Sequence, residues 1–266
     1  MTADFRTLTT PRREGASSDF VLDVPDGWQQ GRGAFGGFGL ASLVHAVEAV
    51  AADPSRSLRS LTATLCGPVL AGEARVQIET LRIGSGTATY GARIVQGGEV
   101  QMHAVVILGK PRDVDGRWIE LEEGPRPDWR TVEPIPPMEG IAPTFSQHFE
   151  YRNSGPIPYT GHSTAHAAGW IRARSSGARD DAYLVACADV YWPSSLSRFS
   201  APRPIATLSF SFTRVEPLDG LDSEAPFFHE GHTISARDGY TVERRTLRGE
   251  DGRLLTVNEQ TIVLIR

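Results

Sequence analysis

One carboxylate lies inside an otherwise apolar run of helical length. Residues 182–192 read AYLVACADVYW, and Asp189 is the only charged residue among them. An ionised aspartate is almost never fully buried without a partner, although a lone aspartate on an apolar helix more often lies at a solvated edge. Either the helix turns Asp189 toward water, or the fold supplies hydrogen-bond donors for it. The second arrangement would make a functional site.

Two further polar side chains stand where an internal repeat predicts apolar or buried surroundings. Thr207 begins a strand and Gln260 lies in the last strand, and the first half of the chain has no equivalents of Asp189 and Gln260. A purely structural repeat has no reason to place unpaired polar groups in one copy alone. We therefore expect one working site, in the C-terminal half. Taken singly, Thr207 and Gln260 could also cap strand ends or face solvent.

Glycines cluster before the first predicted helix, at Gly31, Gly33, Gly36, Gly37 and Gly39. They do not form a P-loop, because no Lys-Ser/Thr pair follows, and no strong strand leads into them as a dinucleotide fingerprint requires. Such a helix start is usually a packing device, but it also leaves backbone N–H groups free to face an anion or a carbonyl oxygen. Gly36 and Gly37 are therefore candidate donors to an oxyanion.

The remaining nucleophiles and metal ligands give weaker signals. His162 and His166 have the i, i+4 spacing of helical metal ligands, but their segment reads as a loop running into a strand, without an acidic third ligand, so we predict no metal. His45 reads as a packed or partly exposed core histidine. Cys66 and Cys187 lie in apolar settings and read as buried free thiols of a reducing compartment. No GxSxG elbow supports a serine hydrolase.

The hydrophobic pattern predicts one helix followed by an antiparallel meander in the N-terminal half. A short strand at 20–24 precedes the helix that begins after the glycines. Apolar alternation then predicts four strands separated by Gly-rich turns, at 58–65, 73–83, 87–96 and 100–108.

The same order recurs in the C-terminal half, with the helix from 182 and strands at 148–153, 166–172, 205–214, 231–237, 239–247 and 254–265. Aligning 60–68 with 207–215 matches apolar residues at every other position and places Ser60 opposite Thr207. The two halves thus look like one unit used twice. We predict an α+β fold of two tandem units, each a helix wrapped by a curved antiparallel sheet, with the two sheets joined edge to edge.

The segment 111–147 contains seven prolines and no sustained apolar period, which indicates a linker. We therefore divide the chain into an N-terminal unit at 1–110, a proline-rich linker at 111–147 and a C-terminal unit at 148–266 that carries the candidate site.

The overall composition is that of an ordinary soluble globular protein of 266 residues, with 40% hydrophobic and 22% charged residues. A formal net charge of -5 without long runs of one sign gives no footprint for nucleic acid and no polybasic membrane patch. We find no secretory signal and no run long enough to span a bilayer, so we expect a cytoplasmic protein.

Four stretches resemble the acyl-CoA thioesterase II family of double hot-dog proteins: GAFGGFGLASLVHA, CADVYWPSSL, IATLSFSFTR and LLTVNEQTIVLI. They cover nearly the whole chain in the right order. The resemblance implies a double hot-dog thioesterase of lipid metabolism that acts on a small-molecule acyl thioester. Coenzyme A would be part of the substrate, and no separate cofactor is expected. Because hot-dog sheets often pair, homo-oligomers are expected by analogy alone.

In that family an Asp on the second hot-dog helix, a Thr or Ser on the next strand and a Gln on the last strand position the attacking water. Asp189, Thr207 and Gln260 match these positions one for one. The resemblance therefore implies that Asp189 is the base and that the other two orient the water, without metal. Residues 161–180 and the linker look particular to this sequence, so substrate specificity is expected there.

Two other functions stay open. A hot-dog dehydratase or hydratase would act on the acyl chain, but such sites usually rely on a His with a carboxylate, and no His accompanies Asp189 in the helix. A non-catalytic acyl-thioester-binding protein would only hold the thioester headgroup. The acyl chain length, the choice between coenzyme A and a carrier protein, and the oligomeric state are not specified by the sequence.

Overall fold

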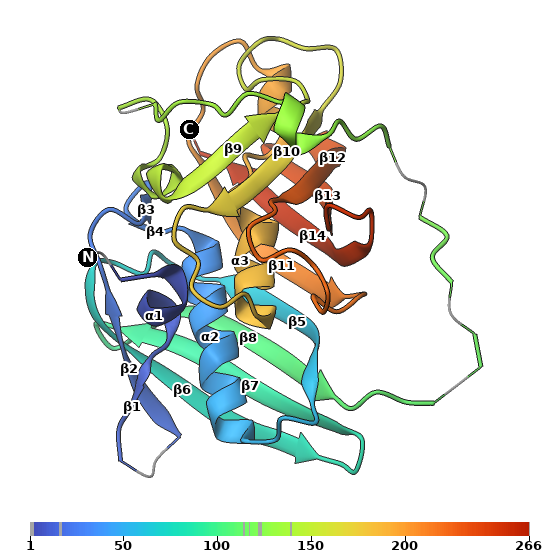
Figure 1. Ribbon diagram of the computed structural model, residues 1–266. Coiled ribbons are helices and arrows are strands. Elements are labelled where there is room, and N and C mark those ends of the chain that lie inside the picture. The colour runs from blue at the N-terminus through green and yellow to red at the C-terminus, as the bar shows by residue number, and fades with distance from the viewer. Residues whose placement is uncertain are drawn as a thin grey trace.

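The computed structural model describes residues 3–15, 18–113, 115–116, 118–121, 124–138 and 140–265, and its main element is one curved antiparallel sheet of twelve strands (Figure 1). A two-stranded ribbon of β3 (Gln29–Gln30) and β4 (Gly33–Ala34) is separate from it. Across the sheet, the strands follow the order β1 (Arg12–Arg13), β2 (Asp19–Val24), β6 (Gly72–Ile83), β7 (Thr87–Gln96), β8 (Glu99–Gly109), β5 (Ser57–Leu65), β11 (Ile205–Arg214), β14 (Leu254–Leu264), β13 (Tyr240–Arg248), β12 (Phe227–Arg237), β10 (His166–Ala173) and β9 (Phe149–Asn153).

The two halves of the chain meet where β5 pairs with β11. Ala63 lies opposite Phe210, and these are the residues that the alignment of the two copies equates. An approximate two-fold relation between the copies explains this, because equivalent strands can pair with each other only around such an axis. The edge-to-edge junction predicted from the sequence is therefore present.

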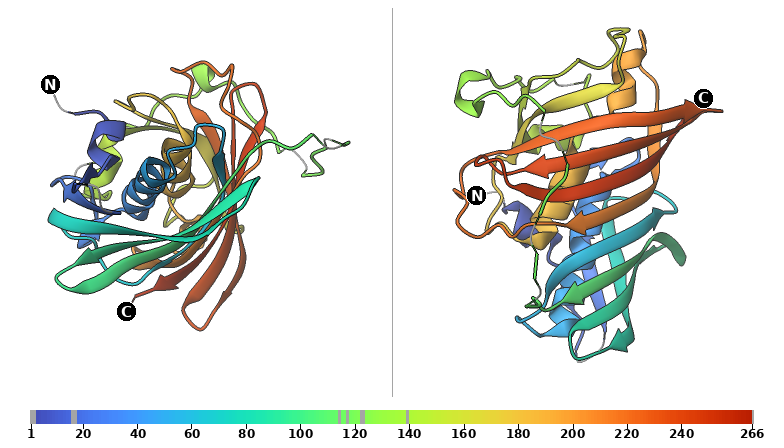
Figure 2. Two further views of the ribbon diagram at one scale, coloured as in Figure 1. Left: turned by 90° about the horizontal axis from the view of Figure 1, so that it is seen from below. Right: turned by 90° about the vertical axis from the view of Figure 1, so that its right-hand side faces the viewer.

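Two helices lie inside the curve of the sheet and pack against each other, as the end-on view in Figure 2 shows. In α2 (Gly36–Ala51) every residue from 37 to 47 is buried, and in α3 (Asp181–Val190) all ten residues are buried. Because the sheet wraps the helices on several sides, neither needs the polar stripe of a surface helix. This explains how a run as apolar as 182–190 remains helical in the interior.

The start and end of α3 have local causes. The Asp180 side chain caps the first turn by accepting from the Tyr183 N–H at 2.9 Å. The helix ends at Val190, and Tyr191 is already extended. Pro193 excludes helical conformation at Trp192, so the helix could not continue through the whole apolar run. Asp189 consequently lies in the last turn of the helix.

A β-bulge in β11 decides where Thr207 points. Thr207 pairs with Ile262 and Ser209 with Thr261, so Leu208 is an extra residue without a partner on β14. Strict alternation would place Thr207 and Phe210 on opposite faces of the sheet. The inserted residue instead brings Thr207 onto the inner face, beside the buried Gln260.

Several sequence-based predictions differ from the structure. The lead before the first predicted strand contains a short helix, α1 (Phe5–Thr9), and β12 begins four residues before the predicted position 231. The prediction that Cys66 is buried is wrong: β5 ends at Leu65, and Cys66 lies beyond it with an exposed side chain. Cys187 is buried as predicted. None of the helices in the described part of the chain has the length and apolar character needed to cross a membrane.

The described part of the predicted linker packs on both halves of the chain, because Thr144 donates to the Gln29 carbonyl and Phe145 stacks on Phe35 of the N-terminal half. It contains the 3-10 turns η1 (Trp129–Thr131) and η2 (Thr144–His148). Trp129 packs against a small buried cluster of Trp170 and Phe228, and the Trp170 indole N–H donates to the Pro127 carbonyl at 3.0 Å. Residues 114, 117, 122, 123 and 139 of the predicted linker lie outside the described residues.

Candidate active site

Asp189 is the centre of a buried hydrogen-bond network. Its residue surface is only 9% exposed. Oδ2 accepts from the Gly37 N–H at 2.8 Å, and Oδ1 accepts from the Gln260 side-chain amide at 3.1 Å. The fold therefore supplies the donors that a buried carboxylate needs.

Gln260 connects Asp189 to Thr207. The Gln260 Oε1 accepts from the Thr207 hydroxyl at 3.3 Å, while its Nε2 donates to Asp189 and also to the Asn258 Oδ1 at 3.0 Å. Asn258 in turn donates to the Ser211 carbonyl, which fixes the orientation of the amide chain. The structure thus brings together the three side chains that the sequence singled out, from α3, β11 and β14.

The glycines at the start of α2 allow the two helices to approach closely. A Cβ atom at Gly36 would lie 2.8 Å from the Asp189 Oδ2, and one at Gly37 would lie 2.9 Å from the Ala186 carbonyl oxygen. Both distances are too short for a side chain, so glycine is required for the contact. The Gly37 N–H is engaged by Asp189, whereas the Gly36 N–H has no hydrogen-bond partner among the described residues.

Burial raises the pKa of the Asp189 carboxyl above its ordinary value. Arg245, the Gly37 N–H and Gln260 act in the opposite direction but do not cancel the effect of burial. A carboxylate with a raised pKa is a stronger base than an exposed aspartate. The environment therefore suits proton abstraction.

A buried ion pair behind the helix end was missed by the sequence analysis. Arg245 and Glu243 on β13 are 2% and 0% exposed, and the Arg245 Nε lies 2.8 Å from the Glu243 Oε1. Arg245 also donates to the carbonyls of Ala188 and Tyr191, on either side of the last turn of α3. In the sequence, the i, i+2 spacing of Glu243 and Arg245 indicates that both side chains point to one face of the strand. Because the adjacent Arg244 is also charged, the sequence does not show which face is buried.

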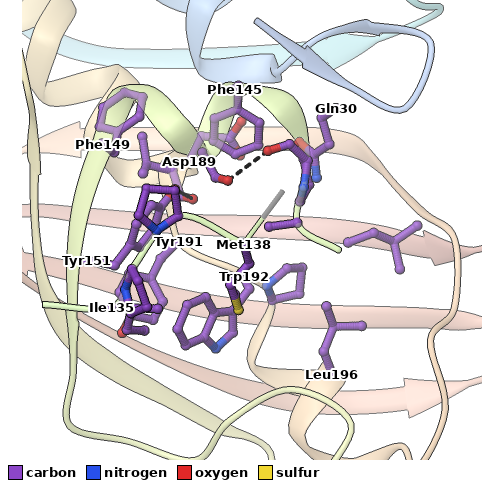
Figure 3. A pocket seen from close by; sticks show the side chains of 18 of the residues that line it. Gln30, Ile135, Met138, Phe145, Phe149, Tyr151, Asp189, Tyr191, Trp192 and Leu196 are labelled. Carbon is purple, nitrogen blue, oxygen red and sulfur yellow. Dashed lines mark hydrogen bonds between the residues drawn. The ribbon is translucent and has the colours of Figure 1, made fainter. Parts of the chain in front are cut away.

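A mostly apolar pocket of about 130 Å³ opens beside Asp189 (Figure 3). Asp189 is the only carboxylate among the described lining residues, and none of them is a histidine. Thr207 and Gln260 do not line the pocket. The wall includes the aromatic rings and larger aliphatic side chains of Phe145, Phe149, Tyr151, Tyr159, Tyr191, Trp192, Ile135, Met138, Leu196 and Ile205, together with smaller apolar residues and prolines. The predicted linker contributes Ile135, Met138 and Phe145, and the segment 161–180 contributes Arg174.

The other candidate groups lie elsewhere. His45 is buried, 3.1 Å from an Asp180 carboxylate oxygen and 3.3 Å from the Thr9 hydroxyl, so it is the packed histidine that we predicted. Burial raises the pKa of the Cys187 thiol to about 12, which leaves it protonated and unreactive. The exposed His162 ring hydrogen-bonds only to Thr164 among the described residues, whereas His166 approaches a different pair of side chains, described below.

Comparison with protein families gives two matches. A model described as the acyl-CoA thioesterase N-terminal domain matches residues 24–109, and one described as the acyl-CoA thioesterase C-terminal domain matches residues 120–264. The second match alone spans more than half of the chain. Among curated proteins, no sequence matches.

Solved structures share the fold across the whole chain. A hot-dog protein of unknown function from Alicyclobacillus acidocaldarius has a TM-score of 0.87 at 19% identity and covers 100% of this chain and 99% of its own. A candidate thioesterase II from Thermobifida fusca has a TM-score of 0.82 at 18% identity, covering 100% of both chains. An acyl-CoA thioesterase II from Mycobacterium marinum has a TM-score of 0.75 at 13% identity, covering 98% of both. The fold is therefore the hot-dog fold.

Proposed function

Because the chain belongs to the acyl-CoA thioesterase family, we propose that it hydrolyses an acyl-CoA thioester by direct attack of a water held by Asp189, Thr207 and Gln260. The observation that carries this proposal is the continuous hydrogen-bonded chain from Thr207 through Gln260 to a buried carboxylate at the wall of an apolar pocket. An acyl pocket and a base are the two things that such a hydrolysis requires.

The directions of the hydrogen bonds fit the activation of water. Thr207 donates its proton to the Gln260 Oε1, so the Thr207 oxygen keeps lone pairs that can accept from a water. A water that donates one proton to Thr207 and the other to Asp189 directs a lone pair toward the thioester carbonyl. Asp189 takes a proton as the oxygen–carbon bond forms. The carbon–sulfur bond then breaks, and the proton passes to the thiolate to give free thiol and carboxylic acid.

The first turn of α2 is the proposed site of the developing oxyanion. The positive end of a helix dipole and an unengaged N–H favour negative charge. Gly37 already donates to Asp189, so in this proposal Gly36 is the donor to the oxyanion and Gly37 holds the base.

The size of the pocket favours a compact acyl group. An apolar cavity of about 150 Å³ accommodates benzene, and the pocket beside Asp189 is about 130 Å³. Its many rings would contact a flat or short acyl group closely. We therefore propose that short or aromatic acyl thioesters are better substrates than long straight chains.

We also propose that 1–110 and 148–266 are the two hot-dog units and that 111–147 connects them. The N-terminal family match ends at 109, which supports the boundary at 110, whereas the C-terminal match begins at 120 and so includes most of the connector. The later part of the connector lines the pocket, so it would contribute to specificity as well as linkage. We also propose that the protein is cytoplasmic and forms homo-oligomers.

The assay that tests this function measures thiol release with a chromogenic reagent across acyl-CoA substrates of increasing length, including aromatic ones. We expect saturable, enzyme-dependent thiol release with at least one compact substrate. Hydration of an enoyl-CoA without thiol release would instead indicate a hydratase. Substrate binding without turnover on any member of the panel would indicate an acyl-thioester-binding protein.

The pH dependence of kcat/KM should report the environment of Asp189. The base must be ionised, and burial raises its pKa, so activity should fall as the pH drops through that raised value. We expect the acid limb to lie above the pKa of about 3.9 of an ordinary aspartate. The measurement is kcat/KM against pH, with folding followed by circular dichroism at each pH. Full activity at about pH 4 would contradict the prediction.

The linker side of the pocket should control acyl length. In the Ile135→Ala variant we expect preference to move toward longer or bulkier acyl groups, because removing three carbons from the wall enlarges the pocket. One methylene of the substrate changes the discrimination between two substrates by about 1 kcal/mol or more. The ratio of kcat/KM between a long and a short substrate should therefore rise by about 10-fold or more. Ile141→Ala is the matched control, since this linker isoleucine is 84% exposed and does not line the pocket.

A further inference from the structure

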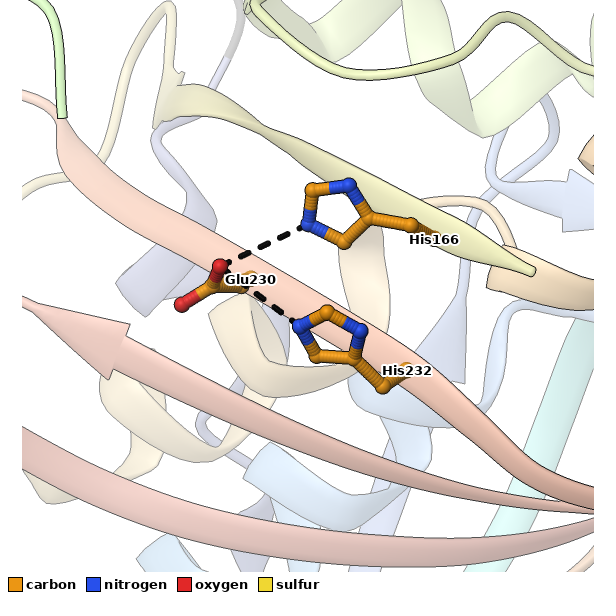
Figure 4. A group of neighbouring side chains, drawn as sticks. All are labelled: His166, Glu230 and His232. Carbon is orange, nitrogen blue, oxygen red and sulfur yellow. Dashed lines mark ion pairs between the residues drawn. The ribbon is translucent and has the colours of Figure 1, made fainter. Parts of the chain in front are cut away.

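Three metal-binding side chains meet on the C-terminal part of the sheet, away from the Asp189 pocket. They are His166 on β10 and Glu230 and His232 on β12 (Figure 4). The Nε2 atoms of both histidines lie 3.5 Å from the same carboxylate oxygen, Glu230 Oε1. This is the only such group of three or more found among the described residues. None of the three lines the Asp189 pocket.

The sheet fixes their relative positions. Glu230 and His232 are two residues apart on one strand, so they face the same side of the sheet. His166 is paired directly with His232 in the ladder between β10 and β12, and the two imidazole rings are stacked with centroids 4.4 Å apart. Ligands held by a hydrogen-bonded ladder lose little freedom on binding a metal, which favours affinity.

The separations between the carboxylate oxygen and the two imidazole nitrogens fit a tetrahedral metal site. With metal–ligand bonds of about 2.0–2.1 Å, neighbouring ligand atoms are about 3.4 Å apart. Both observed nitrogen–oxygen separations are 3.5 Å. The His166 Nε2 is nevertheless buried without a hydrogen-bond partner among the described residues. A separation of 3.5 Å is long for a direct hydrogen bond, and it also fits two ligands that converge on one ion.

The space next to the carboxylate is open. Glu230 and His232 line a pocket of about 380 Å³ together with Gly124 and Arg244. A Cβ atom at position 124 would lie 2.8 Å from the Glu230 Oε1, so the glycine leaves room at this oxygen. Arg244 is opposite His232 in the ladder with β13, and it lies 3.9 Å from Glu259 on its other side. With this cation in the same pocket, an open coordination position would favour an anion or water as the fourth ligand.

We propose that His166, Glu230 and His232 bind a divalent transition-metal ion, with Zn²⁺ as the expected occupant, and that this ion links β10 to β12. Two imidazole nitrogens and one carboxylate oxygen are a ligand set that zinc uses when one coordination position remains open. The sequence predicts no metal for His162 and His166, because no acidic third ligand has matching spacing. The acidic ligand and the second histidine come instead from β12, more than sixty residues after His166.

The test is isothermal titration of tag-free protein with ZnCl₂, together with metal analysis after gel filtration. We expect one saturable site per chain in the wild type. His232→Ala and Glu230→Gln each remove one ligand and should weaken binding by at least about tenfold. His162→Ala is the matched control, because His162 is an exposed histidine at the alternative i, i+4 position and should bind as the wild type does.

Thermal unfolding gives a second readout. Because a ligand that binds only the folded state stabilises it, Zn²⁺ should raise the Tm of the wild type and of His162→Ala but not that of His232→Ala. His232 is 60% exposed at its side chain, so its replacement should leave the fold intact without metal. Absence of saturable binding in the wild type, or unchanged binding in both ligand variants, would overturn the proposal.

Discussion

The Asp189→Asn variant is expected to lose about 10²- to 10⁴-fold in kcat for thioester hydrolysis, the range that a positioned general base contributes. Asparagine has nearly the same shape and can still accept from the Gly37 N–H, so the helix contact should survive. It cannot take a proton from water. The measurement is kcat from thiol release with the best substrate of the panel, at a pH where the wild type is fully active.

Stability measurements separate this loss from misfolding. Because burial raises the pKa of Asp189, the wild type loses stability as pH rises from the unfolded-state pKa through the higher folded-state pKa. The asparagine variant has no such ionisation. The Tm of the variant relative to wild type should therefore increase between about pH 4 and pH 7. An active variant, or an inactive one whose relative Tm falls over this range, would contradict the assignment of Asp189.

Sequence patterns predicted most of the strands because each is either alternating or bounded by glycine turns. For Asp189 the apolar neighbours left two alternatives, a solvated helix edge or burial with donors, and the structure has the second. Alternation alone could not predict the face on which Thr207 lies. The bulge at Leu208 moves the residues before it to the opposite face of the sheet. An extra residue in one strand is visible only against its partner.

Contacts between distant segments were the part that the sequence could not specify. The Arg245–Glu243 pair and the His166 cluster each depend on which face of a strand points inward and on which strands are neighbours. Charged residues are interpreted as exposed by default, so a buried pair escapes notice. Cys66 shows the opposite error, because an apolar neighbourhood in sequence did not place it in the core.

The candidate site also depends on both copies of the repeat. Asp189, Thr207 and Gln260 come from the second copy, but the Gly37 N–H that holds the carboxylate comes from the first. The contact between α2 and α3 is thus part of the site as well as of the core. This explains why the two copies differ: the second copy has the polar groups of the site, and the first has the glycines that allow α2 to approach α3 closely.

This dependence leads to a second large expected effect, in the Gly37→Ala variant. The new Cβ would lie 2.5 Å from a Phe35 ring carbon and 2.9 Å from the Ala186 carbonyl oxygen, and the backbone of α3 cannot rotate away. Overpacking of this kind costs about 1–3 kcal/mol. The N-terminus of α2 must shift away from Asp189, and a displacement of about 1 Å can reduce activity by about 10²-fold.

Gly39→Ala is the matched control, because it lies on the same helix and has a contact of similar length. Its Cβ would lie 2.8 Å from the Met102 methyl carbon, the end of a flexible side chain that can move aside. We expect Gly39→Ala to keep most of its activity, while Gly37→Ala loses both activity and several degrees of Tm. Equal behaviour of the two variants in thiol-release and unfolding assays would show that the distance between α2 and α3 does not control the candidate base.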